Sequence, residues 1–206
     1  MRKYLPWLLT TIWLTAVGAG LHVLWVYEHT PGSAASVPGR WPGDSRIPRA
    51  PGRPTLIMFA HPRCPCTRAS IGELAVLMTH CQNQVKASVV FFQPNGSSQD
   101  WPHTDLWRSA AAIPGVTVRS DQDGVEAKCF QATTSGYVVL YDALGKLVFS
   151  GGITSSRGHA GDNVGRSELT QWLHHETAPA SETPVFGCSL LDPTRGCNKK
   201  ETAWTR

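Results

Sequence analysis

The sequence predicts an α/β domain, a central mixed β-sheet flanked by helices, behind one N-terminal transmembrane helix. Two observations support this: a long uncharged apolar stretch near the start, and short apolar runs that alternate with segments of helical periodicity between residues 54 and 176. The 206 residues have room for one ordinary domain. The net charge is +4 and the basic residues are scattered, so we expect no nucleic-acid partner.

Residues 5–27 form the predicted membrane anchor. They hold no formal charge, and at about 1.5 Å per helical residue they are long enough to cross the hydrocarbon layer of a lipid bilayer. Arg2 and Lys3 precede this stretch and no Lys or Arg follows it until Arg40, which predicts a cytoplasmic N-terminus (residues 1–4) and a periplasmic or other extracytoplasmic soluble part. A cleaved signal peptide is the alternative, because small residues at 16–20 follow an apolar run.

Three segments follow the anchor. Residues 28–53 are rich in Pro and Gly and predict a flexible linker that buries no core. Residues 54–176 form the predicted domain, and residues 177–206 a C-terminal tail. Within the domain we expect strands at 55–59, 85–92, 116–118, 137–141 and 146–149, and helices at 67–80, 105–112, 123–130 and 166–174. The first strand, helix and strand predict a parallel βαβ unit, and the last two strands a hairpin.

The candidate catalytic residues are Cys64 and Cys66, which lie between the first strand and the first helix of the domain. A helix N-terminus stabilises a thiolate, the reactive form of cysteine. Arg63 adds a neighbouring cation, and Pro65 restricts the backbone between the two sulfurs. We therefore expect a solvent-reachable Cys-Pro-Cys redox pair with an exchangeable disulfide. A permanent disulfide or two buried thiols is the structural alternative.

These residues resemble a known family. Phe59 stands five positions before Cys64, and Asp123-Gly124, Asp142 with Gly145-Lys146, and Gly151-Gly152 follow later, as in the TlpA/ResA and AhpC/TSA branches of the thioredoxin-like superfamily. The segment HPRCPCTRAS is also similar to one in membrane-anchored bacterial proteins labelled RedB. The resemblance covers roughly residues 54–175 and implies a thioredoxin-like fold with thiol–disulfide chemistry at Cys64.

Two departures from the family pattern concern the site. The family has Cys-x-x-Cys, whereas here Thr67 occupies the place of the second cysteine and Cys66 lies one position earlier, so the role of Cys66 is a proposal. The family also has a cis-proline loop that binds substrate. Its counterpart is Thr134, Ser135 and Gly136, which contains no proline and for which we expect trans peptide bonds.

Topology brings a polar loop, residues 151–165, toward the same end of the sheet. Its Arg157 and His159 are candidates for steadying the thiolate or carrying its proton, and an ordinary solvated loop is the alternative.

The remaining cysteines have several candidate pairings. Cys188 and Cys197 enclose eight residues, which favours a local structural disulfide in an oxidising compartment. Cys188 could instead fold back as a resolving thiol for Cys64. Pairing of Cys81 with Cys129 is a further alternative, although Cys81 is expected far from the site and buried.

The favoured function is a membrane-anchored thiol–disulfide oxidoreductase that needs no cofactor. Its partners would be protein thiols or disulfides, a redox partner protein and the lipid bilayer. A second class is a copper-binding module, because His61, Cys64 and Cys66 offer soft ligands for Cu(I). A thioredoxin-fold scaffold without catalysis is a third hypothesis. A peroxidase is disfavoured because Thr67 follows the cysteines instead of preceding them.

Overall fold

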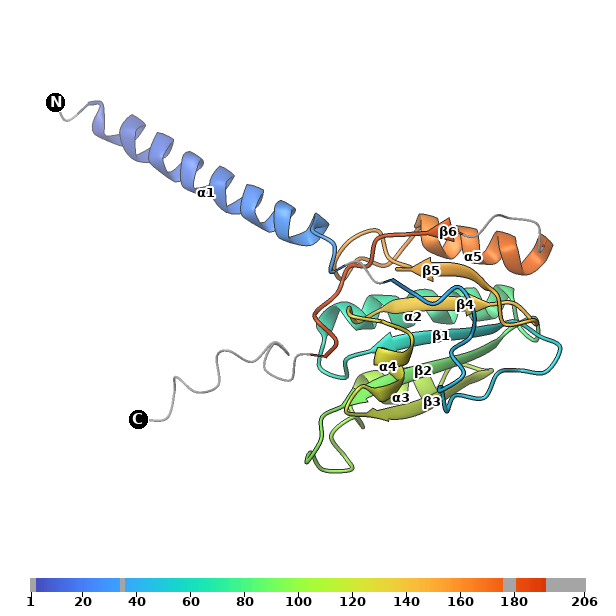
Figure 1. Ribbon diagram of the computed structural model, residues 1–206. Coiled ribbons are helices and arrows are strands. Elements are labelled where there is room, and N and C mark those ends of the chain that lie inside the picture. The colour runs from blue at the N-terminus through green and yellow to red at the C-terminus, as the bar shows by residue number, and fades with distance from the viewer. Residues whose placement is uncertain (1–2, 34–35, 176–180, 192–206) are drawn as a thin grey trace.

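The protein is described by a computed structural model for residues 3–33, 36–175 and 181–191. Its centre is a six-stranded sheet in the order β3-β2-β1-β4-β5-β6 (Figure 1). The strands are β1 (Thr55–Ala60), β2 (Lys86–Gln93), β3 (Val116–Gln122), β4 (Tyr137–Tyr141), β5 (Leu147–Gly151) and β6 (Ser181–Glu182). The helices are α1 (Leu5–His29), α2 (Pro65–His80), α3 (Asp105–Ala111), α4 (Val125–Cys129) and α5 (Val164–His175).

The pairing of the strands confirms the predicted βαβ unit and hairpin. Strands β1, β2 and β3 run parallel, whereas β4 is antiparallel to both β1 and β5. Each predicted strand and helix of the domain is present. The largest differences are β3, which extends to Gln122, and β6, which pairs in parallel with β5 inside the predicted tail.

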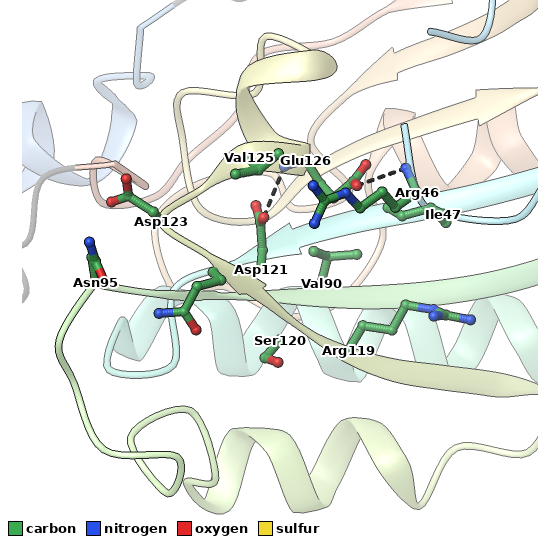
Figure 2. A pocket seen from close by; sticks show the side chains of 11 residues that line it. Arg46, Ile47, Val90, Asn95, Arg119, Ser120, Asp121, Asp123, Val125 and Glu126 are labelled. Atoms are coloured by element: carbon green, nitrogen blue, oxygen red, sulfur yellow. Dashed lines mark hydrogen bonds between the residues drawn. The ribbon is translucent and has the colours of Figure 1, made fainter. Parts of the chain in front are cut away.

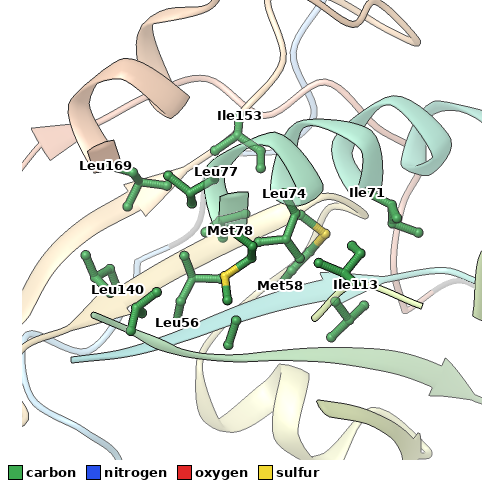
Figure 3. Packing of buried hydrophobic residues seen from close by; sticks show 14 of the residues in the cluster. Leu56, Met58, Ile71, Leu74, Leu77, Met78, Ile113, Leu140, Ile153 and Leu169 are labelled. Atoms are coloured by element: carbon green, nitrogen blue, oxygen red, sulfur yellow. The ribbon is translucent and has the colours of Figure 1, made fainter. Parts of the chain in front are cut away.

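Two apolar clusters fill the two faces of the sheet. The first lies under α2, α3 and α5, where Leu74 and Leu77 of α2 and Leu169 of α5 pack on Leu56 and Met58 of β1 (Figure 3). The second lies on the other face and includes Phe59, Phe130 and Tyr141. Successive residues of β1 point to opposite faces, so a strand covered on both sides must be apolar throughout. All six residues of β1 are buried.

The segment that follows α1 differs from the predicted flexible linker. Ile47 and Ala50 are buried, and the Trp41 ring packs edge-on against Phe130 and Tyr141. Arg40 also forms a β-bridge with Lys146. The apolar residues between the prolines are therefore sufficient to dock this part of the chain on the face of the sheet opposite α2, α3 and α5.

Helix α1 is the only helix in the described part of the chain that is long and apolar enough to cross a membrane. It has 25 residues, none of them buried, and projects away from the domain (Figure 1). Its last turn is held by Arg157, whose backbone N–H donates to Glu28 O (3.0 Å) and whose Nε donates to Tyr27 O (3.1 Å). A single N-terminal helix of this kind is compatible with a membrane anchor.

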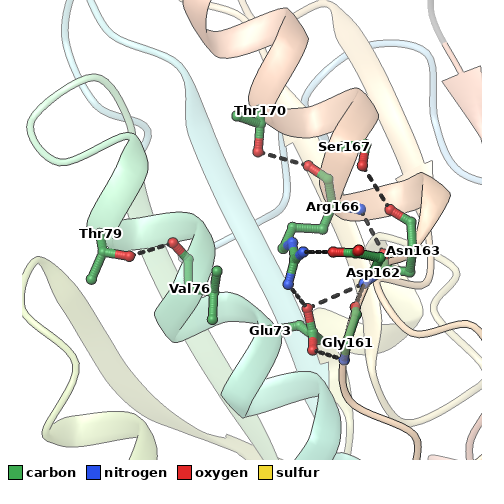
Figure 4. A network of polar contacts seen from close by, with 9 residues as sticks. All are labelled: Glu73, Val76, Thr79, Gly161, Asp162, Asn163, Arg166, Ser167 and Thr170. Carbon is green, nitrogen blue, oxygen red and sulfur yellow. Dashed lines mark hydrogen bonds and ion pairs between the residues drawn. The ribbon is translucent and has the colours of Figure 1, made fainter.

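A buried polar network joins α2 to the start of α5 (Figure 4). The Glu73 carboxylate, 3% exposed, forms an ion pair with Arg166. It also accepts hydrogen bonds from the N–H of Gly161 (2.6 Å) and from Asn163 Nδ2 (3.2 Å). Because charges and hydrogen bonds satisfy both oxygens, this carboxylate is stable in the interior and fixes the loop that leads from Arg157 to α5.

Candidate active site

The two predicted catalytic cysteines lie where β1 ends and α2 begins. Cys64 has an extended backbone (φ −90°, ψ 115°) and is the N-cap residue of α2, and Pro65 occupies the first helical position. Proline suits that position because its missing N–H would have no partner within the helix. The N–H of Cys64 donates to His61 O (3.1 Å) and the N–H of Thr67 donates to Cys64 O (3.1 Å), so tight turns fix the cysteine backbone.

The expectation that both sulfurs are solvent-reachable is wrong for this conformation. Cys64 is 0% exposed and Cys66 is 8% exposed. Part of the predicted tail covers the site: Val185 and Leu190 are buried in the second apolar cluster, and Phe186 is buried as well. The sequence gives no periodic pattern for this short segment, which is why the docking was missed.

Cys188 lies directly against the site. Its Sγ is 2.8 Å from Cys64 Sγ, within hydrogen-bond distance for sulfur. The segment around it pairs with the loop that precedes β4: the N–H of Ser135 donates to Cys188 O and the N–H of Leu190 donates to Thr133 O, both at 2.8 Å. Thr134 and Ser189 form an antiparallel bridge between these two hydrogen bonds. The alternative in which Cys188 folds back toward Cys64 therefore agrees with the described contact.

The surroundings of Cys64 favour its thiolate. The hydrogen-bond interaction with Cys188, followed by that with Cys66, lowers the pKa of Cys64 far below the ordinary value of a thiol, against the opposing effect of burial. The hydrogen bond to Cys188 also lowers the pKa of Cys66, but its hydrogen bond to Cys64 and its burial prevail and raise that pKa overall. Of the two sulfurs, Cys64 is therefore the one that ionises more readily.

The predicted substrate loop lies against the cysteine turn. Ser135 Oγ accepts a hydrogen bond from the N–H of His61 (2.7 Å) and lies 2.6 Å from Thr67 Oγ1. The N–H of Gly136 donates to Phe59 O (2.8 Å), and Gly136 has a φ of +90°, which favours glycine. The described residues contain no cis peptide bond, so the expectation of trans geometry in this loop is confirmed.

The predicted supporting cations have different positions. Arg157 Nη1 donates to Gly187 O (2.6 Å), the residue before Cys188, so this side chain binds the segment that carries Cys188. His159 lies elsewhere, 3.6 Å from the Glu28 carboxylate. Arg63 places its guanidinium over the Trp101 ring, 5.2 Å from the ring centroid.

The structure does not assemble the alternative copper set. Within residues 3–33, 36–175 and 181–191, no group of three His, Cys, Asp or Glu side chains is arranged to hold a metal ion. His61 is 1% exposed, and burial lowers its pKa, which keeps the ring neutral. Its Nδ1 accepts the N–H of Arg63 (3.2 Å), and its ring packs against Phe92 and Trp101.

The other cysteines lie away from this cluster. Cys81 is buried at the C-terminal end of α2, as expected, and Cys129 ends α4. Both are present as thiols, so the Cys81–Cys129 alternative is not formed. Cys197 lies outside the described residues, and the Cys188–Cys197 disulfide stays a prediction.

A separate cavity of about 380 Å³ lies beside β3 and α4 (Figure 2). Its carboxylates are already used in local structure. Asp121 accepts the N–H groups of Glu126 and Ala127 at the start of α4, and Glu126 accepts Ser45 Oγ and the N–H of Arg46. None of the cysteines lines this cavity, so we do not assign it to the candidate active site.

Comparisons with known proteins agree with this architecture. No family model matches the sequence, and no curated protein matches it. Among solved structures, an uncharacterized conserved protein from Geobacillus kaustophilus is similar, with a TM-score of 0.56 and 20% identity over 79% of this chain and 92% of that one. A hypothetical protein from Sinorhizobium meliloti 1021 has a TM-score of 0.51 and 22% identity over 68% and 80% of the two chains.

A third similar structure is a secreted Mycobacterium tuberculosis disulfide oxidoreductase homologous to E. coli DsbE, with a TM-score of 0.43 and 16% identity over 60% of this chain and 82% of that one. The cysteine turn between β1 and α2, in a sheet of this strand order, confirms the resemblance in fold. The fold is thioredoxin-like. Sequence identities this low establish the fold only, so the function rests on the cysteine geometry.

Proposed function

We propose that the protein is a membrane-anchored extracytoplasmic thiol–disulfide oxidoreductase whose reacting atom is Cys64 Sγ. The observation that supports this most strongly is the position of Cys64 as N-cap residue of α2 with thiol hydrogen-bond donors around it. A lowered thiol pKa at a helix N-terminus is the property that nucleophilic cysteines share.

The reaction is thiol–disulfide exchange. The Cys64 thiolate attacks one sulfur of a protein disulfide, forms a mixed disulfide and releases the other sulfur as a thiolate. A second thiol of this chain, with Cys66 as the nearest in sequence, then attacks Cys64 Sγ and releases the reduced substrate. The substrate gains two electrons and the cysteine pair loses them. A redox partner protein carrying a dithiol restores the reduced pair, and the reverse sequence would oxidise a substrate.

The anchor suggests where this chemistry takes place. Arg2 and Lys3 precede α1, and cytoplasmic flanks are enriched in such residues. We therefore propose that residues 1–4 lie in the cytoplasm and that the thioredoxin-like domain lies on the outer side of the membrane, close to the bilayer. Protein substrates there carry disulfides more often than cytosolic proteins do.

The test is a comparison of three full-length proteins in detergent: the parent, Cys64→Ser and Cys129→Ser. Each is assayed for reduction of a fluorescein-labelled peptide disulfide with dithiothreitol as the reductant. We expect Cys64→Ser to fall to the rate of dithiothreitol alone and Cys129→Ser to match the parent. Turnover by a folded Cys64→Ser protein equal to that of the parent would reject the proposed function.

A further inference from the structure

The segment from Gly187 to Leu190 lies next to Cys64 along residues 133–135, part of the loop for which the sequence predicts substrate binding. It pairs with Thr133–Ser135 through two backbone hydrogen bonds and one antiparallel bridge. Addition of an extended segment to an exposed edge is a general way to bind peptides, because backbone groups supply the hydrogen bonds. Here the extended segment belongs to the protein itself.

The pairing places a cysteine over the reactive sulfur. Cys188 is the residue whose carbonyl accepts the N–H of Ser135, and its Sγ lies 2.8 Å from Cys64 Sγ. A disulfide bond is about 2.05 Å long, so only a small movement separates this contact from a covalent bond. The thiols of Cys64 and Cys188 both influence the pKa of Cys66, the third cysteine of this cluster.

Several contacts fix the segment in this register. Arg157 Nη1 donates to Gly187 O (2.6 Å), and the N–H of Gly32 donates to Val185 O (2.8 Å). Gly187 lies so close to Ser135 O that a Cβ there would overlap it. On either side, Phe186 and Leu190 are buried. The fit therefore involves backbone and side chains on both sides of Cys188.

We infer that Cys188 is a third redox-active cysteine, which resolves the mixed disulfide at Cys64 when its segment returns to the loop that the substrate has occupied. This inference rests on the proposed function. Because Cys64 is 0% exposed while the segment is docked, the segment has to leave before a substrate disulfide reaches the sulfur.

The exchange balances in two steps. First, the Cys64 thiolate forms a bond to one substrate sulfur, and the substrate S–S bond breaks to release a thiolate. Second, the Cys188 thiol gives its proton to the thiolate released in the first step, its Sγ forms a bond to Cys64 Sγ, and the mixed disulfide breaks to release the second substrate thiolate. The product is a Cys64–Cys188 disulfide. A dithiol reductant, or exchange with Cys66 that moves the bond to Cys64–Cys66, frees Cys188 again.

The test removes Cys66, so that any resolution has to come from another thiol of the chain. Three full-length proteins in detergent are compared: Cys66→Ser, Cys66→Ser with Cys188→Ser, and Cys66→Ser with Cys197→Ser as the matched control. Each reduced protein is mixed once with a fluorescein-labelled peptide disulfide, quenched with acid at successive times, and analysed by mass spectrometry for the peptide adduct and the mapped disulfides. Circular dichroism confirms that each variant is folded.

We expect Cys66→Ser and the Cys197 control to lose the adduct and to accumulate the Cys64–Cys188 disulfide. The variant without Cys188 should retain its adduct on Cys64 at least about tenfold longer. A stable adduct in Cys66→Ser itself, or its resolution by Cys197, would overturn the role of Cys188 and leave the proposed function intact. Absence of an adduct on Cys64 in all three proteins would overturn both.

Discussion

Helix α2 carries two buried polar sites that differ in how their partners are supplied. At Glu73, the partners Arg166, Asn163 and Gly161 belong to the loop and helix that complete the domain. At Cys64, the hydrogen-bond partner comes from a short segment after β6, held by a few backbone contacts. The first arrangement stabilises the fold. In the second, the Cys64 sulfur is covered by a segment that a substrate can displace.

The largest expected effect is on stability, at Glu73. Replacement by Ala removes the charge that Arg166 pairs with, in a site where the carboxylate is 3% and the Arg side chain 17% exposed. Because Arg166 also contacts Asp162, we expect a loss of about 2–4 kcal/mol in the free energy of unfolding, measured by urea denaturation. Glu168→Ala on α5 is the control, and an equal loss there would contradict a special role for Glu73.

Replacing Gly187 by Ala should weaken the docking of residues 185–190, which cover Cys64, on the rest of the domain. The new Cβ would overlap Ser135 O, and relieving that overlap costs about 1–3 kcal/mol. We expect N-ethylmaleimide to label Cys64 at least about tenfold faster than in the parent, because about 1.4 kcal/mol changes the open population tenfold. Ser189→Ala, at an exposed neighbour, is the control. Unchanged labelling of Cys64 in Gly187→Ala would show that this segment is not its cover.

Cys188→Ala should raise the pKa of Cys64, because the hydrogen bond with Cys188 contributes most to lowering it and alanine has no donor to replace the thiol. The thiolate absorbance at 240 nm, measured from pH 5 to 9 in reduced protein, should therefore titrate at higher pH than in the parent. Cys197→Ala should leave the curve unchanged, and identical curves for Cys188→Ala and the parent would refute the contact.

The same pKa shift predicts how stability depends on pH. A thiol whose pKa is lower in the folded state releases its proton on folding, so the unfolded state binds more protons between the two pKa values. The contribution of Cys64 to the unfolding free energy is therefore complete above the ordinary thiol pKa and is lost as pH falls toward the folded value. Removing Cys188 should weaken this dependence, as measured by urea denaturation at several pH values.

The smallest effect is expected at Arg157, which joins the cover to the end of α1. Its side chain donates to Gly187 O and Tyr27 O. Removing one such hydrogen bond costs about 0.5–1.5 kcal/mol, so Arg157→Ala should increase Cys64 labelling by only a few-fold. His159→Ala, whose ring contacts Glu28, is the control. A labelling increase as large as that of Gly187→Ala would mean that Arg157 alone holds the segment.

The sheet and its helices could be predicted because their signals are local. The apolar run at 55–59 and the helical spacing of Ile71, Leu74 and Leu77 each predict burial from neighbouring residues alone. The Cys64 turn follows from the same pattern, since it lies between a strand and a helix. The thiol–disulfide function was predicted from this pair of cysteines together with the resemblance of the sequence to thioredoxin-like proteins.

The parts that were missed depend on contacts between distant residues. The sequence offers the contact between Cys188 and Cys64, 124 positions apart, only as one of several pairings, because two hydrogen bonds and a few apolar side chains have no sequence period. No local pattern indicates that Glu73 is buried, because its partner Arg166 lies 93 positions later in the chain. Likewise, the proline-rich composition of residues 28–53 predicts a linker without a core. The burial of Ile47 and the packing of Trp41 depend on the second apolar cluster, which distant residues form.

Redox titration of the full chain measures whether Cys64 Sγ is the reacting atom. The protein is equilibrated in glutathione buffers of graded potential, quenched, and mapped by mass spectrometry for every disulfide. We expect a disulfide that contains Cys64 to form within the physiological range of potentials. A Cys64 that stays a thiol across that range, whatever other disulfides form, would contradict this assignment.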